Sequence, residues 1–254
     1  HTLKADVAQS SCACALAAGY ELIDTASVYQ NETEVGSAVH ESGVQRGAIF
    51  LTSKLKPHDQ GYAPARLAFE RTCGALAVEY LDLFLIHWPG TAKTPLTADA
   101  NAVNRHESWR ALQELQASGR IHAIGVSNFE ISHLEALRLA PTTTVKPAVN
   151  QIELHPRLYI AQKPLLDYCA SHGIVVQAYA SLGTGSLLAD PDIVAVAQRT
   201  GLSEAAVLLL WAVGHGFAVI PRSTDPSRIA ANRAAVEQAR SAPVLAKPVL
   251  PHHL

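Results

Sequence analysis

The order of elements that decides the fold is contained in residues 48–87, AIFLTSKLKPHDQGYAPARLAFERTCGALAVEYLDLFLIH. Residues 48–53 and 81–87 are short apolar runs rich in Ile, Leu and Phe, which is typical of strands buried on both faces. Residues 64–77 between them have the periodicity of a helix. A strand, a helix and a second strand in this order predict a parallel βαβ unit.

The same alternation continues toward both ends of the chain. We expect further strands at residues 21–25, 122–127, 148–154, 174–180 and 217–221. We expect helices at residues 5–18, 32–42, 105–118, 132–139, 162–172 and 226–240, with a pair of helices covering 192–214. Glycines stand where three of these helices should stop, and Ser203 and Asp225 are plausible helix starts; the glycines are Gly19, Gly119 and Gly173. The longest irregular segment, residues 89–104, follows a strand directly, and loops of that length are usually functional.

Composition limits the class of protein. The chain has 254 residues, 48% of them hydrophobic, so it is long enough to bury a large core, and we expect one domain covering residues 1–254. A net charge of −2 offers no basic stripe for nucleic acid, and apolar runs such as 205–213 are too short to span a membrane. Cys12 and Cys14 lie two apart on an expected helix, so we interpret them as reduced. These features favour a cytoplasmic protein that acts on a small molecule, and a monomer is our default expectation.

Two parallel-sheet architectures compete for this pattern. A doubly wound dinucleotide-binding sheet should carry a glycine fingerprint after its first strand, but the nearest candidate, Gly183 and Gly185 followed by Leu188, is late and lacks the third glycine. A (β/α)8 barrel places its site at the C-terminal ends of several strands. The chemistry-bearing residues fall at such ends: Asp24, Lys54, His87, Asn128, Gln151 and Tyr179. We therefore predict an α/β fold, a parallel (β/α)8 TIM barrel, although seven strands are counted and the first strand is missing from the sequence.

Seven short strings occur in a recognisable order. They are IDTASVYQNE (23–32), TSKL (52–55), LIHWP (85–89), GVSNF (125–129), NQIELHP (150–156), AYASLG (178–183) and IPRS (220–223). Together they give the chain a resemblance to the aldo-keto reductase family over residues 3–236. The resemblance implies a barrel that reduces carbonyl groups with NADPH.

Carbonyl reduction requires a proton donor for the developing alkoxide. A tyrosine with a pKa of about 10 is a weak acid, so we expect the Lys54 ammonium to lower the pKa of Tyr29, and Asp24 to hold Lys54 charged. His87 would orient the carbonyl. The family's matching residues have these catalytic roles, with Tyr29 as general acid. Tyr29, His87 and Trp88 are the expected substrate contacts, although Trp88 could equally be a packing residue.

The cofactor residues divide by the part of NADPH that they would contact. Ser127, Asn128 and Gln151 offer donors and acceptors for the nicotinamide carboxamide, and Tyr179 offers a ring for stacking. Ser181, Leu182, Gly183 and Thr184 would let the backbone approach the pyrophosphate, although Gly183 and Thr184 could instead form only a flexible turn. A further set would grip the terminal phosphate and the adenine, namely Arg222, Ser223, Thr224, Arg228 and Asn232. The two arginines could instead be a solvated face.

Two other functions remain open from the sequence. One is a catalytically weak or inactive relative that keeps the cofactor grip and acts as a binding or structural protein, like the channel-associated and lens-crystallin members of the family. The other is a metal-dependent hydrolase using His87 and His155, although we expect no metal because Gln151 on the same strand has a cofactor role. The tail after Val236 has little likeness to the family's usual C-terminal loop, so substrate selectivity is poorly readable.

Overall fold

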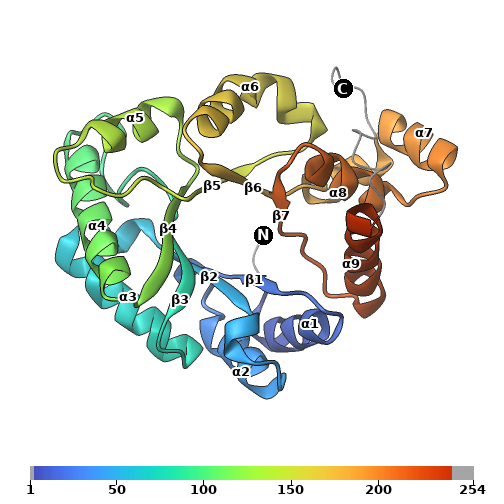
Figure 1. Ribbon diagram of the computed structural model, residues 1–254, viewed down its shortest axis with the longest axis horizontal. Helices are drawn as coiled ribbons and strands as arrows, with labels where there is room; N and C mark the ends of the chain where they lie inside the picture. Colours follow the sequence, from blue (N-terminus) through green and yellow to red (C-terminus); the bar gives the residue numbers. More distant parts are fainter. Residues whose placement is uncertain (1–2, 242–254) are drawn as a thin grey trace.

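A computed structural model describes residues 3–241, in which strands and helices alternate along the chain (Figure 1). The strands are β1 Leu22–Asp24, β2 Phe50–Leu55, β3 Leu81–Ile86, β4 Ile121–Ser127, β5 Val149–Glu153, β6 Val175–Tyr179 and β7 Ala218–Val219. All neighbours in the seven-stranded sheet pair in parallel and in sequence order, β1 to β7. The predicted strands and the barrel class are confirmed, because a doubly wound sheet would reverse its strand order.

Helices cover the outer face of the curled sheet (Figure 1). They are α1 Ala5–Ala17, α2 Glu32–Glu41, α3 Tyr62–Leu76, α4 Ala100–Ala117, α5 Ile131–Leu139, α6 Pro156–Ser171, α7 Pro191–Thr200, α8 Glu204–Gly214 and α9 Pro226–Ser241. The predicted stops are confirmed, since Gly19, Gly119 and Gly173 all have positive φ. The helix start at Ser203 is confirmed by its hydroxyl, which accepts a 3.2 Å hydrogen bond from the backbone N–H of Ala206.

Two helices begin five or more residues earlier than predicted. α6 starts at Pro156, six residues before the predicted position, because proline fits the first helical position, where its missing N–H is not needed. The helix then continues through Pro164. α4 starts at Ala100, and its first turn includes Asn101, whose side chain accepts from the backbone of Thr91 and donates to the carbonyl of Pro95. Because this first turn is held by polar contacts, the apolar pattern from which the helix was predicted does not extend to it.

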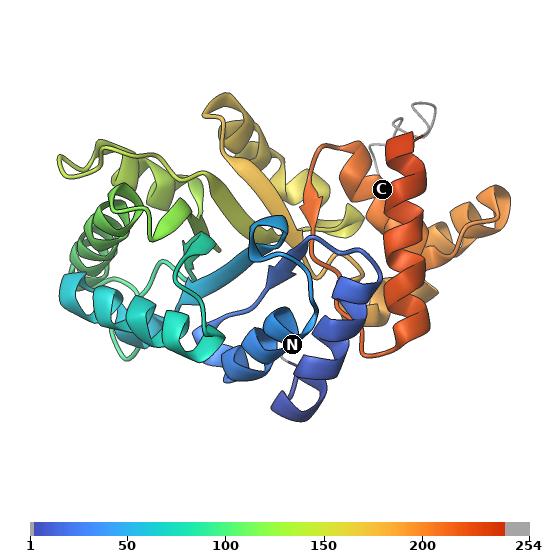
Figure 2. The same ribbon diagram turned by 60° about the horizontal axis from the view of Figure 1, so that its bottom comes forward.

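In the described part of the chain the sheet is open between its first and last strands, whereas the helices around it meet. Among residues 3–241, β1 and β7 are the two edges of the sheet and no pairing joins them. The helices do meet at this place, since α9 runs beside α1 in both views (Figures 1 and 2). The Tyr20 hydroxyl donates to the carbonyl of Ile229 at 3.0 Å, and Arg233 Nε donates to the carbonyl of Gly19 at 2.9 Å. A helix seam therefore joins the two ends of the described chain.

The core lies between the sheet and its helices. Strand β3 is buried along nearly its whole length, and its Phe84 packs edge-on against Phe69 of α3 with ring centroids 5.5 Å apart.

The four cysteines are free, as predicted for Cys12 and Cys14. Within the described residues no single helix is long and apolar enough to cross a membrane; α7 and α8 pass that test only as a pair, bent by 92°.

The contact between α2 and α3 depends on a glycine. A Cβ placed on Gly36 would lie 2.5 Å from the backbone carbonyl oxygen of Leu76, which cannot move aside as a side chain can. We expect Gly36→Ala to lower the free energy of unfolding by about 1–3 kcal/mol. Gly74 in α3 has open space around it, so Gly74→Ala should raise stability by up to about 1 kcal/mol. Urea denaturation of both variants tests this, and equal effects of the two substitutions would contradict the close approach.

Candidate active site

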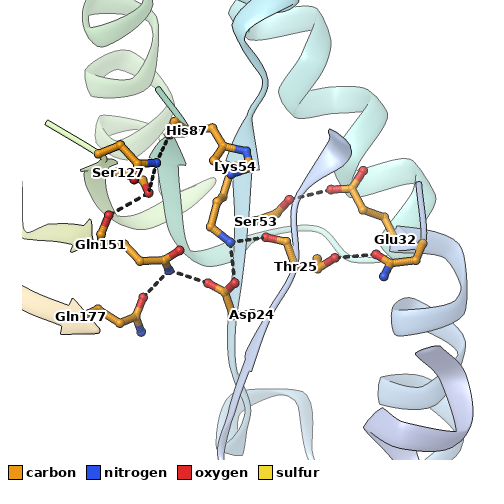
Figure 3. A network of polar contacts seen from close by, with 11 residues as sticks. Asp24, Thr25, Glu32, Ser53, Lys54, His87, Ser127, Gln151 and Gln177 are labelled. Carbon is orange, nitrogen blue, oxygen red and sulfur yellow. Dashed lines mark hydrogen bonds and ion pairs between the residues drawn. The ribbon is translucent and has the colours of Figure 1, made fainter. Parts of the chain in front are cut away.

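A fully buried ammonium lies at the centre of the barrel mouth. Lys54 at the end of β2 has no exposed side-chain surface, and its Nζ forms an ion pair with Oδ1 of Asp24 at the end of β1 (Figure 3). Nζ also donates a 2.9 Å hydrogen bond to the carbonyl of Thr25. Because a buried charge is stable only when it is paired and hydrogen-bonded, these contacts explain how Lys54 is accommodated in the core.

The polar network continues from Asp24 across the barrel. The second carboxylate oxygen of Asp24 accepts a 2.7 Å hydrogen bond from Nε2 of Gln151 on β5. The same nitrogen donates at 2.6 Å to Oε1 of Gln177 on β6 (Figure 3). Strands β1, β2, β5 and β6 are therefore joined inside the barrel by side chains as well as by the sheet.

Tyr29 and His87 complete the predicted group of four. Tyr29 lies in the short 3-10 turn η1 Ser27–Tyr29, and its ring meets the His87 ring edge-on with centroids 5.7 Å apart. Lys54 Nζ lies 5.2 Å from the centroid of the Tyr29 ring. The structure thus brings Asp24, Tyr29, Lys54 and His87 together, as their positions at strand ends predicted.

The pKa of Tyr29 corrects one expectation. Burial raises the pKa of the Tyr29 phenol above its ordinary value, and the negative charge of Asp24 raises it further. The net shift of the Tyr29 pKa is therefore upward, opposite to the direction predicted from Lys54, because burial and the charge of Asp24 outweigh the effect of the ammonium. Lys54 Nζ lies 5.2 Å from the centroid of the Tyr29 ring, and its charge is matched by the ion pair with Asp24.

His87 is a neutral imidazole. Burial, with a smaller contribution from the charge of Lys54, lowers the pKa of His87 to about 3. Its Nδ1 is buried and has no hydrogen-bond partner in the described part of the chain. The backbone carbonyl of His87 accepts a 3.0 Å hydrogen bond from Nδ2 of Asn128, which ties the ends of β3 and β4 together.

The side chains expected to hold a carboxamide are connected to one another. Ser127 Oγ donates to the backbone carbonyl of Gln151 at 2.8 Å and accepts from Asn128 Nδ2 at 3.1 Å. The Tyr179 hydroxyl donates to Oδ1 of Asn128 at 2.8 Å, which holds the tyrosine ring half-buried beside them. Asn128 itself adopts a left-handed backbone, with φ of 61°. Ser127, Asn128, Gln151 and Tyr179 thus lie together at adjacent strand ends.

The segment expected at a pyrophosphate is a structured turn. Leu182 precedes the 3-10 segment η4 Gly183–Ala189, and Ser181 Oγ bonds back to the carbonyl of Ala178 at 3.2 Å. Gly183 has φ of 56°, and a Cβ there would lie 2.6 Å from Cγ of Leu187, so only glycine fits. Thr184 is exposed with φ of 55°. These contacts give the segment a defined backbone, and its role at a pyrophosphate stays a prediction.

The residues expected to bind the terminal phosphate and the adenine follow β7 and are not part of the buried network around Lys54. Arg222 and Thr224 are exposed, and Asn232 is buried on α9. Arg228 is exposed and its Nε lies 3.7 Å from Oδ2 of Asp225. Ser223 Oγ bonds to the backbone of Asp225, whose carboxylate in turn caps α9 by accepting from Ser227 at 2.8 Å. The loop before α9 is thus organised by Asp225.

Several residues that hold Tyr29 were missed from the sequence. Ser27 Oγ donates to the carbonyl of Lys54 at 3.0 Å, and Thr25 Oγ1 donates to Asn31 at 2.8 Å, so the turn bearing Tyr29 is fastened at both ends. Glu32 is buried and accepts from Ser53 Oγ at 2.6 Å (Figure 3). Burial raises the pKa of this carboxyl. The sequence contained one signal for such contacts, namely polar residues within otherwise apolar strands, such as Ser53 and Gln177.

Trp88 and the following loop line the rim. The Trp88 side chain is 48% exposed, while its carbonyl accepts from Nε2 of Gln60 at 2.7 Å. Arg105 donates to the next carbonyl, that of Pro89, at 2.8 Å. The loop is therefore held by buried polar side chains.

The metal-site alternative has little support, because His155 meets only Glu153, at 3.7 Å, and no group of three possible metal ligands is found in the described residues.

Comparison with known proteins gives a consistent picture. The profile described as "Aldo/keto reductase family" matches residues 2–243. A glyoxal reductase of Bacillus subtilis is 43% identical over 225 residues, covering 89% of this chain and 76% of the relative. A solved aldo/keto reductase from Brucella melitensis superposes with a TM-score of 0.82 at 41% identity, covering 91% of this chain and 82% of that one. A mutant of the protein Gox0644, solved in complex with NADPH, superposes with a TM-score of 0.81 at 37% identity, covering 91% and 79%.

The lowered pKa of His87 predicts acid sensitivity. Between pH 6.5 and 3 the unfolded chain binds a proton at His87 that the folded protein does not, so stability falls as the pH falls, by roughly 2 kcal/mol between pH 7 and 5. We expect His87→Gln to flatten the pH dependence of the unfolding free energy measured by urea denaturation. His58→Gln, at an exposed position, should keep the wild-type slope. An unchanged slope in the His87 variant would show that this imidazole is not held neutral.

Proposed function

The chain belongs to the aldo/keto reductase family, and from this membership we propose that it reduces aldehydes or ketones to alcohols with NADPH, with Tyr29 donating the proton. The observation that carries the proposal is the buried Lys54 and Asp24 ion pair beside the rings of Tyr29 and His87, at one mouth of the barrel. We propose small reactive aldehydes as the first substrates to examine, because a relative at 43% identity is named a glyoxal reductase.

The residues present fit a nicotinamide dinucleotide phosphate. Ser127, Asn128 and Gln151 form a polar wall at the mouth, and Tyr179 is fixed next to them by its hydroxyl. Arg222 is exposed, and no hydrogen bond or ion pair links it to another described residue, which leaves its guanidinium available for a phosphate. When bound, NADPH supplies the hydride.

The raised pKa of Tyr29 suits a proton donor. The phenol keeps its proton throughout the neutral range, so it is present in the donating form. The alkoxide that develops from a carbonyl is more basic than a phenolate, so transfer of the proton is favourable. The positive charge of Lys54, close to the ring, then stabilises the phenolate as it forms, and this help is greatest in the transition state.

Neutral His87 serves a separate purpose. A neutral imidazole has one N–H, and the raised cost of charging this buried ring keeps it in that form. We propose that this N–H orients the carbonyl oxygen of the substrate between His87 and the Tyr29 hydroxyl. Trp88, half-exposed at the rim, provides an apolar contact for the remainder of the substrate.

The decisive experiment follows NADPH absorbance in the presence of glyoxal and a panel of small aldehydes. We expect turnover, and we expect Tyr29→Phe to lower kcat by about 10²–10⁴-fold because the donated proton is absent. The variant should still bind NADPH, which fluorescence titration can check. NADPH binding without turnover by the wild-type protein would favour the binding-protein alternative, and full activity of the Phe variant would refute Tyr29 as the acid.

A second experiment addresses the phosphate grip. If Arg222 binds the terminal phosphate of NADPH, Arg222→Gln should raise KM for NADPH by about tenfold or more and leave KM for NADH unchanged, because a charge-assisted bond is lost only with the phosphorylated cofactor. Arg199→Gln on α7, another exposed arginine, is the matched control and should change neither value. Equal effects on the two cofactors would contradict the assignment.

A further inference from the structure

Gln177 is a buried polar residue that the mechanism above does not use. It lies on β6, only 3% exposed, and stands opposite Gln151 in the register of β5 and β6. Its flanking residues Val176 and Ala178 are buried and apolar. A buried amide in such a strand is costly unless its hydrogen bonds serve the fold or the site.

The hydrogen bonds around Gln151 have a fixed direction. A carboxylate can only accept, so the oxygen of Asp24 that lies 2.7 Å from Gln151 must face the amide nitrogen. The other N–H of that nitrogen goes to the carbonyl oxygen of Gln177, at 2.6 Å. Both N–H groups of Gln151 are engaged, and among the described residues nothing donates to its Oε1.

Asn128 is fixed in the same way. The backbone carbonyl of His87 can only accept, so the Asn128 amide turns its nitrogen toward it, and the second N–H goes to Ser127 Oγ. The single hydroxyl proton of Ser127 is donated to the backbone of Gln151. What remains free on the three side chains is a lone pair of Ser127, one on Asn128 Oδ1 and the carbonyl oxygen of Gln151.

We propose that Gln177 is a positioning residue, which holds the Gln151 amide so that the wall formed by Ser127, Asn128 and Gln151 offers only hydrogen-bond acceptors. Such a wall binds a group that donates, as the –NH2 of a carboxamide does, and rejects a carboxylate. The inference rests on the proposed function, since it concerns how that site recognises the nicotinamide end of NADPH. Gln177 acts through Gln151 and touches neither substrate nor cofactor.

The first test needs only the wild-type protein. Isothermal titration compares NADPH with its nicotinic acid counterpart, which carries a carboxylate in place of the carboxamide. We expect the acid form to bind at least tenfold more weakly, because its oxygens meet acceptor oxygens of the wall. Equal affinities would overturn the inference. No binding of NADPH at all would instead refute the proposed function, so the two failures are distinguishable.

The second test removes the acceptor on Gln177. Gln177→Met keeps the length of the side chain but removes one of the two acceptors of the Gln151 amide, which is then held by Asp24 alone. With this looser hold we expect NADPH affinity to fall about three- to tenfold and the preference for NADPH over the acid form to narrow. Gln177→Glu keeps an acceptor oxygen and should preserve the preference. Gln113→Met, at a buried glutamine that binds the carbonyl of Thr142, is the matched control and should change stability without changing the preference.

The variant measurements are interpreted only for folded protein, checked by circular dichroism. If Gln177→Met does not fold, Gln177→Thr replaces it, because threonine is too short to reach Gln151. If folded Gln177→Met or Gln177→Thr prefers NADPH over the acid form as strongly as the wild-type protein does, the proposed role of Gln177 is overturned. A narrowed preference in the Gln113 variant would do the same, because the effect would then follow from lost stability alone.

Discussion

The barrel mouth is organised by one constraint, the buried charge of Lys54. An ammonium with no exposed surface is tolerated only with a carboxylate beside it, and Asp24 at the neighbouring strand end supplies one. Asp24 then needs donors on its second oxygen, and the Gln151 amide provides one. Each contact requires the next, so the electrostatics of one lysine determine the orientation of side chains on four strands. The site is part of the core rather than an addition to its surface.

Strand β2 shows how the same segment serves fold and site together. Successive residues of a strand point to opposite faces, so Lys54 faces the barrel interior while Ser53 meets Glu32 of α2. Two carboxylates, Asp24 and Glu32, therefore flank a single strand from opposite sides. The turn that carries Tyr29 lies between these two residues in the sequence, and this explains why a short, partly exposed segment can hold an aromatic ring in a defined position.

Much of the architecture was predictable because periodicity and alternation act locally. All seven strands and the rim positions of Asp24, Lys54 and His87 follow from apolar runs and from the rule that parallel strands end at one edge. The first turns of α4 and α6 were not predicted from apolar periodicity. The first turn of α4 is held by polar contacts of Asn101, and that of α6 starts at Pro156. The pKa of Tyr29 was predicted in the wrong direction, since it depends on burial and on the distance to Asp24, which no pattern of residue types contains. Gln177 was missed although a polar residue in an apolar strand is a signal, because its contact with Gln151 depends on the register of β5 and β6.

The seam between α1 and α9 has a consequence for the order of folding. Its two hydrogen bonds join residues 209 and 214 positions apart, whereas neighbouring strands in the sheet are linked through one or two α-helices. Closing so long a loop costs more chain entropy than any of the strand pairings it encloses. Loop entropy therefore favours pairing of the strands before the ring of helices closes.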